Sequence, residues 1–490
     1  MKNFIPIESL KQYSKKYRNN IALESENKKF SYKKIWNSIK TFASTISKID
    51  ETPLVVVVGR KGFLSYVSML GVLLAGGTYI PISLNLPFKR IFKIILASKS
   101  KIIICPDDQK LVLKKRFPTM SILSEKNIFF KRKKNFLKKP KPNRLAYIIF
   151  TSGSTGEPKG VCISRESLNH YLKWLIKALK MGPGKRCSQF PEIGFDLSVA
   201  DIFASLCSGA TLIPAVSKYS NIFPGRFIKE KKITHLICVP SLIDIINNAQ
   251  DLNKKNINSL ETIFFCGEPL LKSHVSSIFK AKKRVKIINT YGPTEATVSC
   301  TFKRLSFSNF QKFSLTSMSV GKAIPGMKLR LQKGENLNNN EGEILISGIQ
   351  VADGYLDKNK NKNKFFFNKK QRSFMTGDYA IKKKGEIYFK SRIDNQIKIK
   401  GHRIELDEID YNVRQLGYRN VNSVVLKKYI ITFVANIKRI NKNEITKKLS
   451  KALPEYMVPQ YIVKINKLPI NRNGKINKNK LIQSAKKIIN

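Results

Sequence analysis

Short apolar runs recur along most of the chain, separated by longer segments that have a different periodicity. The runs lie at residues 54–58, 102–104, 146–150, 233–239 and 262–265. Their length and their richness in β-branched and aromatic side chains are typical of buried strands. The sequence therefore predicts a set of strands that are covered on both faces.

Helical periodicity separates these runs, and it is clearest directly after Ser164. Serine is a favourable N-cap residue, and Lys173, Lys177 and Lys180 fall off the apolar face of this segment. The face itself consists of Leu168, Tyr171, Leu172, Leu175, Ile176 and Leu179. Alternation of strands with such helices predicts an α/β fold in layers, with largely parallel sheets.

After about residue 321 the pattern changes to shorter β-like segments separated by glycine turns. Residues 381–389 predict a hairpin that turns at Lys384 and Gly385. Two segments rich in lysine and asparagine, residues 131–144 and 358–372, predict exposed loops, and we expect the second to be mobile.

Length and composition are those of a globular enzyme. The chain has 490 residues, of which 42% are hydrophobic, enough for a large core and two to four domains. The longest apolar stretch, residues 67–82, is interrupted by glycine and proline, so we expect neither a signal peptide nor membrane insertion. Seven scattered cysteines without a metal-binding spacing indicate reduced thiols and a cytoplasmic protein.

A loop rich in small and hydroxylated residues directly follows the apolar run at 147–150. Its glycines allow successive backbone N–H groups to face one concavity, and Lys159 adds a positive charge, so the loop predicts a polyphosphate site for ATP. Pro158 and Gly160 occupy positions that a Walker loop reserves for glycine and for serine or threonine, which excludes that motif. The residues of this loop that we expect to bind ATP are Thr151, Ser152, Gly153, Ser154, Thr155 and Lys159.

The loop resembles the phosphate-binding signature of the adenylate-forming, or AMP-binding, superfamily. Further segments resemble other signatures of this superfamily in the same order and with similar spacing, and the resemblance covers almost the whole chain. These segments lie at residues 74–81, 195–198, 289–295, 354–356, 376–378, 392–394, 400–405 and 473–475. One departure is Ser391, which stands where the superfamily usually has glycine before the arginine.

The resemblance implies two domains. Residues 1–393 would form the AMP-binding domain, with two α/β subdomains and a small β-barrel. Residues 394–490 would form a mobile α+β lid that rotates about a hinge at Asp394 between two half-reactions.

The resemblance also implies roles in ATP binding and catalysis. Tyr291 would cover the adenine, Asp378 would accept hydrogen bonds from the ribose, and Glu295 would hold Mg²⁺. Arg392 would contact phosphate or ribose, and Lys475 would neutralise the charge that develops between the carboxylate substrate and the α-phosphate. The remaining residues expected to line the nucleotide site are Asn289, Thr290, Gly292, Pro293 and Thr294.

Three residues would define the substrate as a small amino acid. Asp196 would pair with the α-ammonium group, as in the amino-acid branch of the superfamily, although an aspartate before an apolar helix is also a common N-cap. Cys266 and Val298 resemble the pocket residues of the D-alanine-activating ligases, although a buried cysteine is most often only a small apolar residue. Lys475 would reach the substrate carboxylate from the lid.

The predicted reaction is ATP-dependent adenylation of an amino acid, with D-alanine preferred, followed by transfer to the phosphopantetheine thiol of a separate carrier protein. Proline or glycine remains the alternative substrate. The net charge of +58 also leaves open a basic nucleic-acid-binding protein. Because the excess is mostly lysine spread along the chain, we favour a solvated surface, a monomer and no nucleic-acid role, with a positive field that assists encounter with ATP and an acidic partner.

Overall fold

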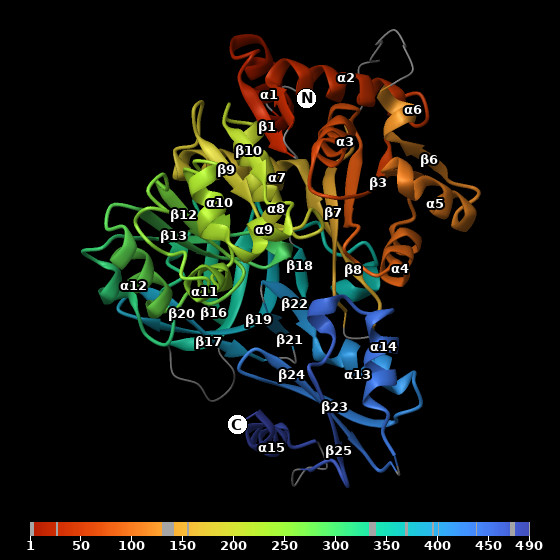
Figure 1. Ribbon diagram of the computed structural model, residues 1–490, viewed down its shortest axis with the longest axis vertical. Coiled ribbons are helices and arrows are strands. Elements are labelled where there is room, and N and C mark those ends of the chain that lie inside the picture. The colour runs from red at the N-terminus through yellow and green to blue at the C-terminus, as the bar shows by residue number, and fades with distance from the viewer. Residues whose placement is uncertain are drawn as a thin grey trace. The chain divides into compact units, whose positions relative to one another are not determined.

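The computed structural model describes residues 4–25, 28–129, 142–153, 156–332, 340–367, 371–393, 396–399, 401–437, 439–470 and 476–489. The chain forms two compact units (Figure 1). The first consists of residues 1–83, 98–149 and 160–393, and the second of residues 84–97, 150–159 and 394–490.

A nine-stranded sheet forms one layer of the first unit. Its central strands are parallel, because their connections return across the sheet through helices, and antiparallel strands close both edges. The strand order is β15 (Lys322–Ala323), β14 (Thr301–Leu305), β13 (Lys286–Tyr291), β12 (Thr262–Phe265), β11 (His235–Cys238), β9 (Arg186–Gln189), β10 (Thr211–Pro214), β1 (Ile21–Ser25) and β2 (Lys28–Ser31).

A six-stranded sheet forms a second layer, and its pairs β6/β5, β5/β3, β3/β4 and β4/β7 are parallel. Residues 54–58, 102–104 and 146–150 all lie in this sheet, which confirms the parallel α/β prediction for these segments. The order is β6 (Ser121–Ser124), β5 (Ile102–Cys105), β3 (Leu54–Gly59), β4 (Thr78–Ser83), β7 (Leu145–Thr151) and β8 (Lys159–Ser164).

Helices that are apolar on more than one side join the two sheets into one core. Helix α3 packs on β3 and β4 (Figure 1), whereas α8 packs on β9 and β10, and every residue of α8 is buried. Helix α7 begins after Ser164, whose hydroxyl accepts a hydrogen bond from Ser167 N, as its sequence predicts. The helices of this unit are α1 (Ile5–Lys16), α2 (Tyr32–Ile46), α3 (Phe63–Leu74), α5 (Lys110–Arg116), α6 (Glu125–Phe129), α7 (Arg165–Leu179), α8 (Leu197–Leu206), α9 (Lys218–Ile222), α10 (Pro224–Glu230), α11 (Ser241–Asn248) and α12 (Lys272–Ala281).

An antiparallel five-stranded sheet occupies the part of the first unit where the resemblance predicted a small barrel. The predicted hairpin is confirmed, since β19 and β20 pair around Lys384 and Gly385, which both have positive φ. The prediction of a loop at 358–372 is wrong in part, because Phe365 packs on Tyr355 and Phe374 and so draws a short strand onto β19. The strands are β16 (Met327–Gln332), β17 (Glu341–Gly348), β18 (Phe365–Phe367), β19 (Arg372–Lys383) and β20 (Glu386–Arg392).

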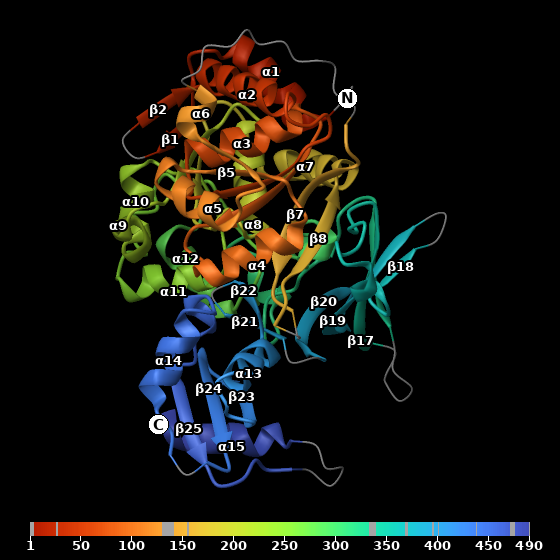
Figure 2. The ribbon, with the colours of Figure 1, turned by 90° about the vertical axis from the view of Figure 1, so that its right-hand side faces the viewer.

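The second unit is a small α+β assembly that also includes residues 84–97, which carry most of α4 (Phe88–Ser98), and the loop 150–159. Helix α13 packs on one face of its three-stranded sheet and α15 on the other (Figure 2), because alternate residues of β24 point to opposite faces. Its further elements are β21 (Gln396–Ile399), β22 (His402–Glu405), α13 (Leu406–Arg414), β23 (Asn420–Leu426), β24 (Tyr429–Ala435), α14 (Lys442–Ser450), β25 (Tyr461–Ile465) and α15 (Lys478–Ile489).

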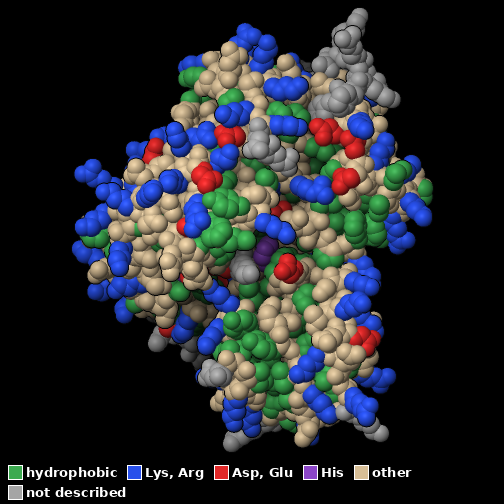
Figure 3. Space-filling view, in the orientation of Figure 1, with side chains coloured by type: hydrophobic (Ala, Val, Ile, Leu, Met, Phe, Trp, Pro, Cys, Tyr) green, Lys and Arg blue, Asp and Glu red, His purple; other side chains and the backbone are tan. Residues whose placement is uncertain are grey.

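The described surface has its positive charge spread widely. Lysine and arginine side chains are scattered over the face in Figure 3 and do not merge into one patch there. All seven cysteines are buried and free of disulfides. No helix among the described residues combines the length and the apolar character that crossing a bilayer requires.

A buried carboxyl group in the second unit provides a test of its packing. Asp410, on α13, accepts a hydrogen bond from Asn422 Nδ2 at 3.3 Å, and burial raises the pKa of its carboxyl group to about 6. The folded unit therefore retains the proton of Asp410 up to a higher pH than the unfolded chain does. As pH rises from about 4 to above 6, this difference lowers the free energy of unfolding.

We expect Asp410→Asn to increase the free energy of unfolding by about 1 to 3 kcal/mol at pH 7.5 and by much less at pH 4.5. Urea unfolding of both proteins at the two pH values measures this difference. Asp407→Asn, the same change at a less buried position of α13, is the matched control and should not produce the gain. An equal effect of Asp410→Asn at both pH values would show that folding does not raise the pKa of Asp410.

Candidate active site

Three side chains from two sheets meet in the first unit. The Tyr291 hydroxyl, at the end of β13, donates to Asp378 Oδ2 at 2.6 Å, and Arg392 Nη1 donates to Asp378 Oδ1 at 2.6 Å. Asp378 lies on β19 directly opposite Arg392 on β20, and Gly377, with φ +73°, precedes it. Strand pairing therefore fixes the carboxylate and the guanidinium in one place.

Asp378 is buried between a cation and a hydroxyl donor. Its side chain is 1% exposed, and the Arg392 guanidinium and the Tyr291 hydroxyl each donate a hydrogen bond to it. Burial raises the pKa of Tyr291 well above its ordinary value, and Asp378 raises it further, so the phenol stays protonated as a donor. A carboxylate held in this way can accept hydrogen bonds from a diol such as a ribose.

A second buried carboxylate lies on the turn that follows β13. Glu295, 1% exposed, accepts a hydrogen bond of 2.7 Å from the Tyr355 hydroxyl, and its backbone carbonyl accepts one of 2.8 Å from Ala352 N. The sequence identified Tyr355 only as part of a motif, and its role as the partner of Glu295 was missed. No periodicity or spacing would have revealed that contact, because 60 residues separate the two.

Glu295 fits a magnesium site of a particular kind. Among the described residues there is no group of three or more His, Cys, Asp or Glu side chains that would form a metal cage. Mg²⁺ usually binds through one or two carboxylates and takes further ligands from phosphates and water. Glu295 could therefore hold this ion only together with a nucleotide.

The segment between these groups has an unusual backbone. Thr297 and Val298 have φ values of +57° and +67°, a conformation that is uncommon for β-branched residues and that persists where surrounding contacts impose it. A Cβ on Gly292 would lie 2.6 Å from Ser299 Cα, so this position requires glycine. Such strained conformations are concentrated at functional sites, and here they occur directly after Glu295 on the same turn.

Cys266 and Val298 lie in direct contact below this turn. The thiol of Cys266 donates to Val298 O at 3.5 Å, and both residues are buried. Thr290 Oγ1 donates to Phe265 O at 2.7 Å and ties the two segments together. The pair predicted to limit substrate size is thus brought together.

Asp196 lies at the N-cap position of α8, but its side chain makes no capping hydrogen bond. Its side chain is therefore not explained by the ordinary structural role of such an aspartate. Burial raises the pKa of Tyr171 well above its ordinary value, and the charges of Cys266, Asp196 and Asp201 raise it further. Asp196 is 7% exposed.

Other residues expected at the nucleotide have structural partners of their own. Asn289 Nδ2 donates to Ser319 O at 2.8 Å and, like Thr290, is buried. These hydrogen bonds tie β13 to the neighbouring segments at Phe265 and Ser319. Pro293 and Thr294 lie between Gly292 and Glu295 on the same turn and are buried.

The small-residue loop belongs to the second unit. Gly153 O accepts from Gly156 N at 3.0 Å, and a Cβ on Gly153 would lie 2.2 Å from Glu157 O. Ser152 Oγ donates to Arg403 O at 2.7 Å, and Lys159 Nζ lies 3.3 Å from Glu405 Oε1. In this structure Ser152 and Lys159 both contact β22.

Four predicted residues lie outside the described residues: Ser154 and Thr155 of the loop, the hinge residue Asp394, and Lys475. Thr151 is described, and its hydroxyl donates to Lys159 O at 3.5 Å.

Comparison with known proteins gives consistent matches. The sequence model of the family described as AMP-binding enzyme matches residues 10–356. The D-alanine–D-alanyl carrier protein ligase of Listeria monocytogenes serotype 4a is 29% identical over 98% of this chain and 99% of its own. The ligase of the same name from Staphylococcus epidermidis is 31% identical over 94% of this chain and 96% of its own. The Vibrio cholerae adenylation domain AlmE, solved with glycyl-adenosine-5′-phosphate, superposes with a TM-score of 0.84 at 25% identity, covering 99% of this chain and 97% of its own.

Proposed function

The chain belongs to the family of AMP-binding enzymes, and on that premise we propose that it activates D-alanine with ATP and transfers it to a carrier protein. In the first step the carboxylate oxygen of the amino acid forms a bond to the α-phosphorus of ATP, and pyrophosphate leaves. In the second step the thiol of a phosphopantetheine arm attacks the aminoacyl carbonyl, and AMP leaves. The first step thus releases pyrophosphate and the second releases AMP, while the aminoacyl group passes from the adenylate to the thiol.

We assign the nucleotide to Tyr291, Asp378 and Arg392, with Asp378 as the acceptor for the ribose hydroxyls. Arg392 would orient that carboxylate through its hydrogen bond and would contact phosphate or ribose. The loop containing Thr151, Ser152 and residues 153–155 would enclose the phosphates, with Lys159 as a cation once it exchanges Glu405 for the nucleotide.

We assign Mg²⁺ to Glu295, oriented by Tyr355. The ion would supply charge neutralisation for the phosphoryl oxygens. The hydroxyl of Tyr355 would orient the carboxylate through its hydrogen bond to Glu295 Oε1. Lys475 would add positive charge at the reacting carboxylate and α-phosphate.

The observation that carries the amino-acid assignment is Asp196. Asp196 places a nearly buried carboxylate at the start of the buried helix α8, and an apolar pocket with one anion selects a zwitterion. Cys266 and Val298 would make the pocket small. D-Alanine is favoured because both carrier protein ligase relatives match nearly the full chain.

Glycine is the second candidate, and one observation favours it. The Vibrio cholerae domain that superposes on the chain was solved with a glycyl adenylate. A pocket that accommodates one methyl group also admits glycine, with a loss of only about 1 to 3 kcal/mol in transition-state binding.

We further propose a separate carrier protein as acceptor, a monomeric enzyme and no nucleic-acid partner. The scattered positive charge would favour encounter with an acidic carrier in a salt-dependent way. The seven free cysteines support a reducing compartment, which we take to be the cytoplasm.

The two-step function is tested with ATP, D-alanine and a D-alanyl carrier protein in its holo and apo forms. We expect the holo carrier to gain the mass of one alanyl group, with release of AMP and pyrophosphate, and the apo carrier to remain unmodified. Pyrophosphate release without loading of the holo carrier would contradict the second step.

Substitution of Cys266 tests the proposed size limit. We expect Cys266→Ala to relax selection against larger or L-configured amino acids by about 1 to 3 kcal/mol, because the freed volume adjoins the side-chain pocket. Exchange rates with D-alanine, L-alanine, glycine, L-proline and D-serine measure the profile. Cys105→Ala, also a buried cysteine but in β5 of the other sheet, is the control. An unchanged profile for Cys266→Ala would show that Cys266 does not limit the substrate pocket.

A further inference from the structure

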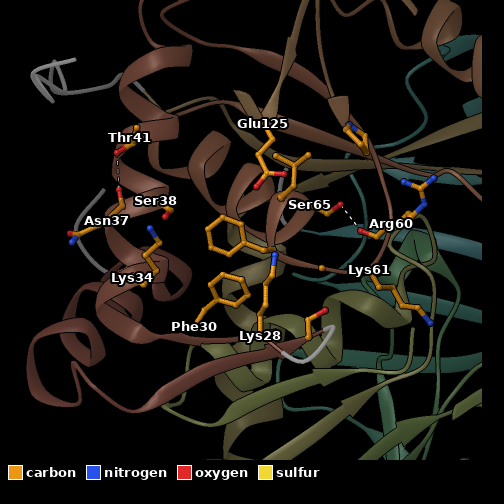
Figure 4. A pocket seen from close by; sticks show the side chains of 15 residues that line it. Lys28, Phe30, Lys34, Asn37, Ser38, Thr41, Arg60, Lys61, Ser65 and Glu125 are labelled. Atoms are coloured by element: carbon orange, nitrogen blue, oxygen red, sulfur yellow. Dashed lines mark hydrogen bonds between the residues drawn. The ribbon is translucent and has the colours of Figure 1, made fainter. Parts of the chain in front are cut away.

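A cavity of about 680 Å³ lies in the first unit, between the hairpin strand β2, helix α2 and the start of α3 (Figure 4). None of the described residues assigned to ATP, Mg²⁺ or the amino acid lines it. Its walls combine a helix N-terminus, hydroxyl groups, cations and two phenylalanine rings. Each of these features places a constraint on the kind of ligand that would fit.

The N-terminus of α3 opens into this cavity through residues 62–65. The N-cap residue is Gly62, which offers no side chain, and no capping hydrogen bond is present. The first N–H groups of a helix have no carbonyl partner within it, and the helix dipole makes this end positive. Such an end is complementary to an anion, although by itself it does not establish a site.

Two buried hydroxyl groups provide an independent indication of a ligand. Ser38, on α2, is 6% exposed and Ser25, at the end of β1, is 7% exposed, and both line the cavity. Neither hydroxyl forms a hydrogen bond with another residue in the described part of the chain. Buried polar groups are nearly always satisfied, so these two require water or a ligand as partner.

The charges around the cavity favour an anion. Lys28 and Lys34 line it without an ion pair to any described residue, whereas Lys61 is 3.4 Å from Glu192 and serves the protein itself. Glu125 is the one carboxylate among the described lining residues. These cations favour a ligand with negative charge. They do not identify the site by themselves, because lysine is abundant over the whole chain.

An apolar wall lies beside the polar end. The rings of Phe30 and Phe63 are stacked with centroids 4.5 Å apart, and both line the cavity. Phe63 is also the first residue of α3, so the apolar wall adjoins the helix N-terminus. A ligand held here would combine an anionic head with an apolar or aromatic body.

We propose that this cavity binds a small organic phosphate. The phosphate would accept hydrogen bonds from the N–H groups of Leu64 and Ser65 in the first turn of α3 and from the hydroxyls of Ser38 and Ser25. The apolar body of the ligand would lie against Phe30 and Phe63, and Lys34 would balance the charge.

Calorimetric titration of the full chain with phenyl phosphate and with inorganic phosphate tests this proposal. We expect phenyl phosphate to bind about tenfold more tightly, because only it buries a ring against the two phenylalanines. Equal binding of the two probes, or no binding of phenyl phosphate at millimolar concentration, would overturn the proposal.

Paired variants on α2 locate the binding. Lys34→Glu should weaken phenyl phosphate at least about tenfold, because it reverses a charge at the cavity wall, and Ser38→Ala should weaken it about threefold. Their controls are Lys33→Glu, an exposed neighbour that does not line the cavity, and Ser44→Ala, a buried serine of the same helix. Equal losses of affinity within each pair would show that phenyl phosphate binds through the general positive field or at another site. That result would refute binding in this cavity.

Discussion

An Asp196→Asn variant should lose amino-acid-dependent pyrophosphate exchange while it keeps its affinity for ATP. The substitution retains the shape of the side chain and removes the charge that we assign to the substrate ammonium group. An ammonium group buried without its partner costs about 3 to 5 kcal/mol, which corresponds to a loss of about a hundredfold to a few thousandfold in kcat/KM for the amino acid.

Asp201→Asn is the matched control for this experiment. Asp201 lies on the same helix and is fully buried, and burial raises the pKa of its carboxyl group well above its ordinary value. The asparagine there replaces a group that is already neutral, so exchange should change little. If Asp196→Asn retained the wild-type kcat/KM, Asp196 would be a structural residue and the substrate class would be open again.

A Lys475→Ala variant should lose adenylate formation and keep most of its thioester-forming activity with a preformed aminoacyl adenylate. A cation that meets the charge developing at the α-phosphate contributes about 3 to 4 kcal/mol to the transition state, or a factor of about a hundred to a thousand. The second half-reaction has no such charge at phosphorus, and the family resemblance places this lysine on a lid that changes orientation between the two steps.

Each half-reaction is measured separately, the first as pyrophosphate exchange and the second as loading of the holo carrier from synthetic adenylate. Lys480→Ala, an exposed lysine on α15, controls for the loss of one positive charge and should affect neither step. Equal losses in both steps with Lys475→Ala, in a folded protein, would contradict the alternation of the lid.

Local pattern was sufficient to predict the parts of the fold that depend on burial of continuous apolar surface. The strands β3, β5 and β7 are short apolar runs in the sequence and buried strands in the structure, and the hairpin at Lys384 and Gly385 forms where its turn residues predict it. These elements are specified by residues close to one another in the chain.

Elements whose stability comes from distant partners were not predictable in this way. Strand β18 lies in a lysine-rich segment and forms because Phe365 packs on Phe374. Helix α15 is rich in lysine, and it is held by Leu481 and Ala485 on the sheet of the second unit. In both cases a few apolar contacts outweigh a predominantly polar composition.

In the candidate site too, motifs identify residues, whereas the contacts between them come only from the structure. Asp378 and Arg392 could be named from their motifs, but only strand register shows that they form an ion pair. The hydrogen bond from Tyr355 to Glu295 and the strained φ of Val298 depend on tertiary contacts, so no sequence pattern contains them. The structure therefore adds how the site is held, which the motifs leave undetermined.

The most direct test of the central claim is ATP–pyrophosphate exchange by the purified enzyme with single amino acids. We expect exchange that depends on D-alanine and Mg²⁺, weaker exchange with glycine, and none above background with bulky amino acids, because in our proposal Cys266 and Val298 limit the size of the substrate that Asp196 binds. No exchange with any amino acid, or a preference for a bulky side chain, would contradict this account.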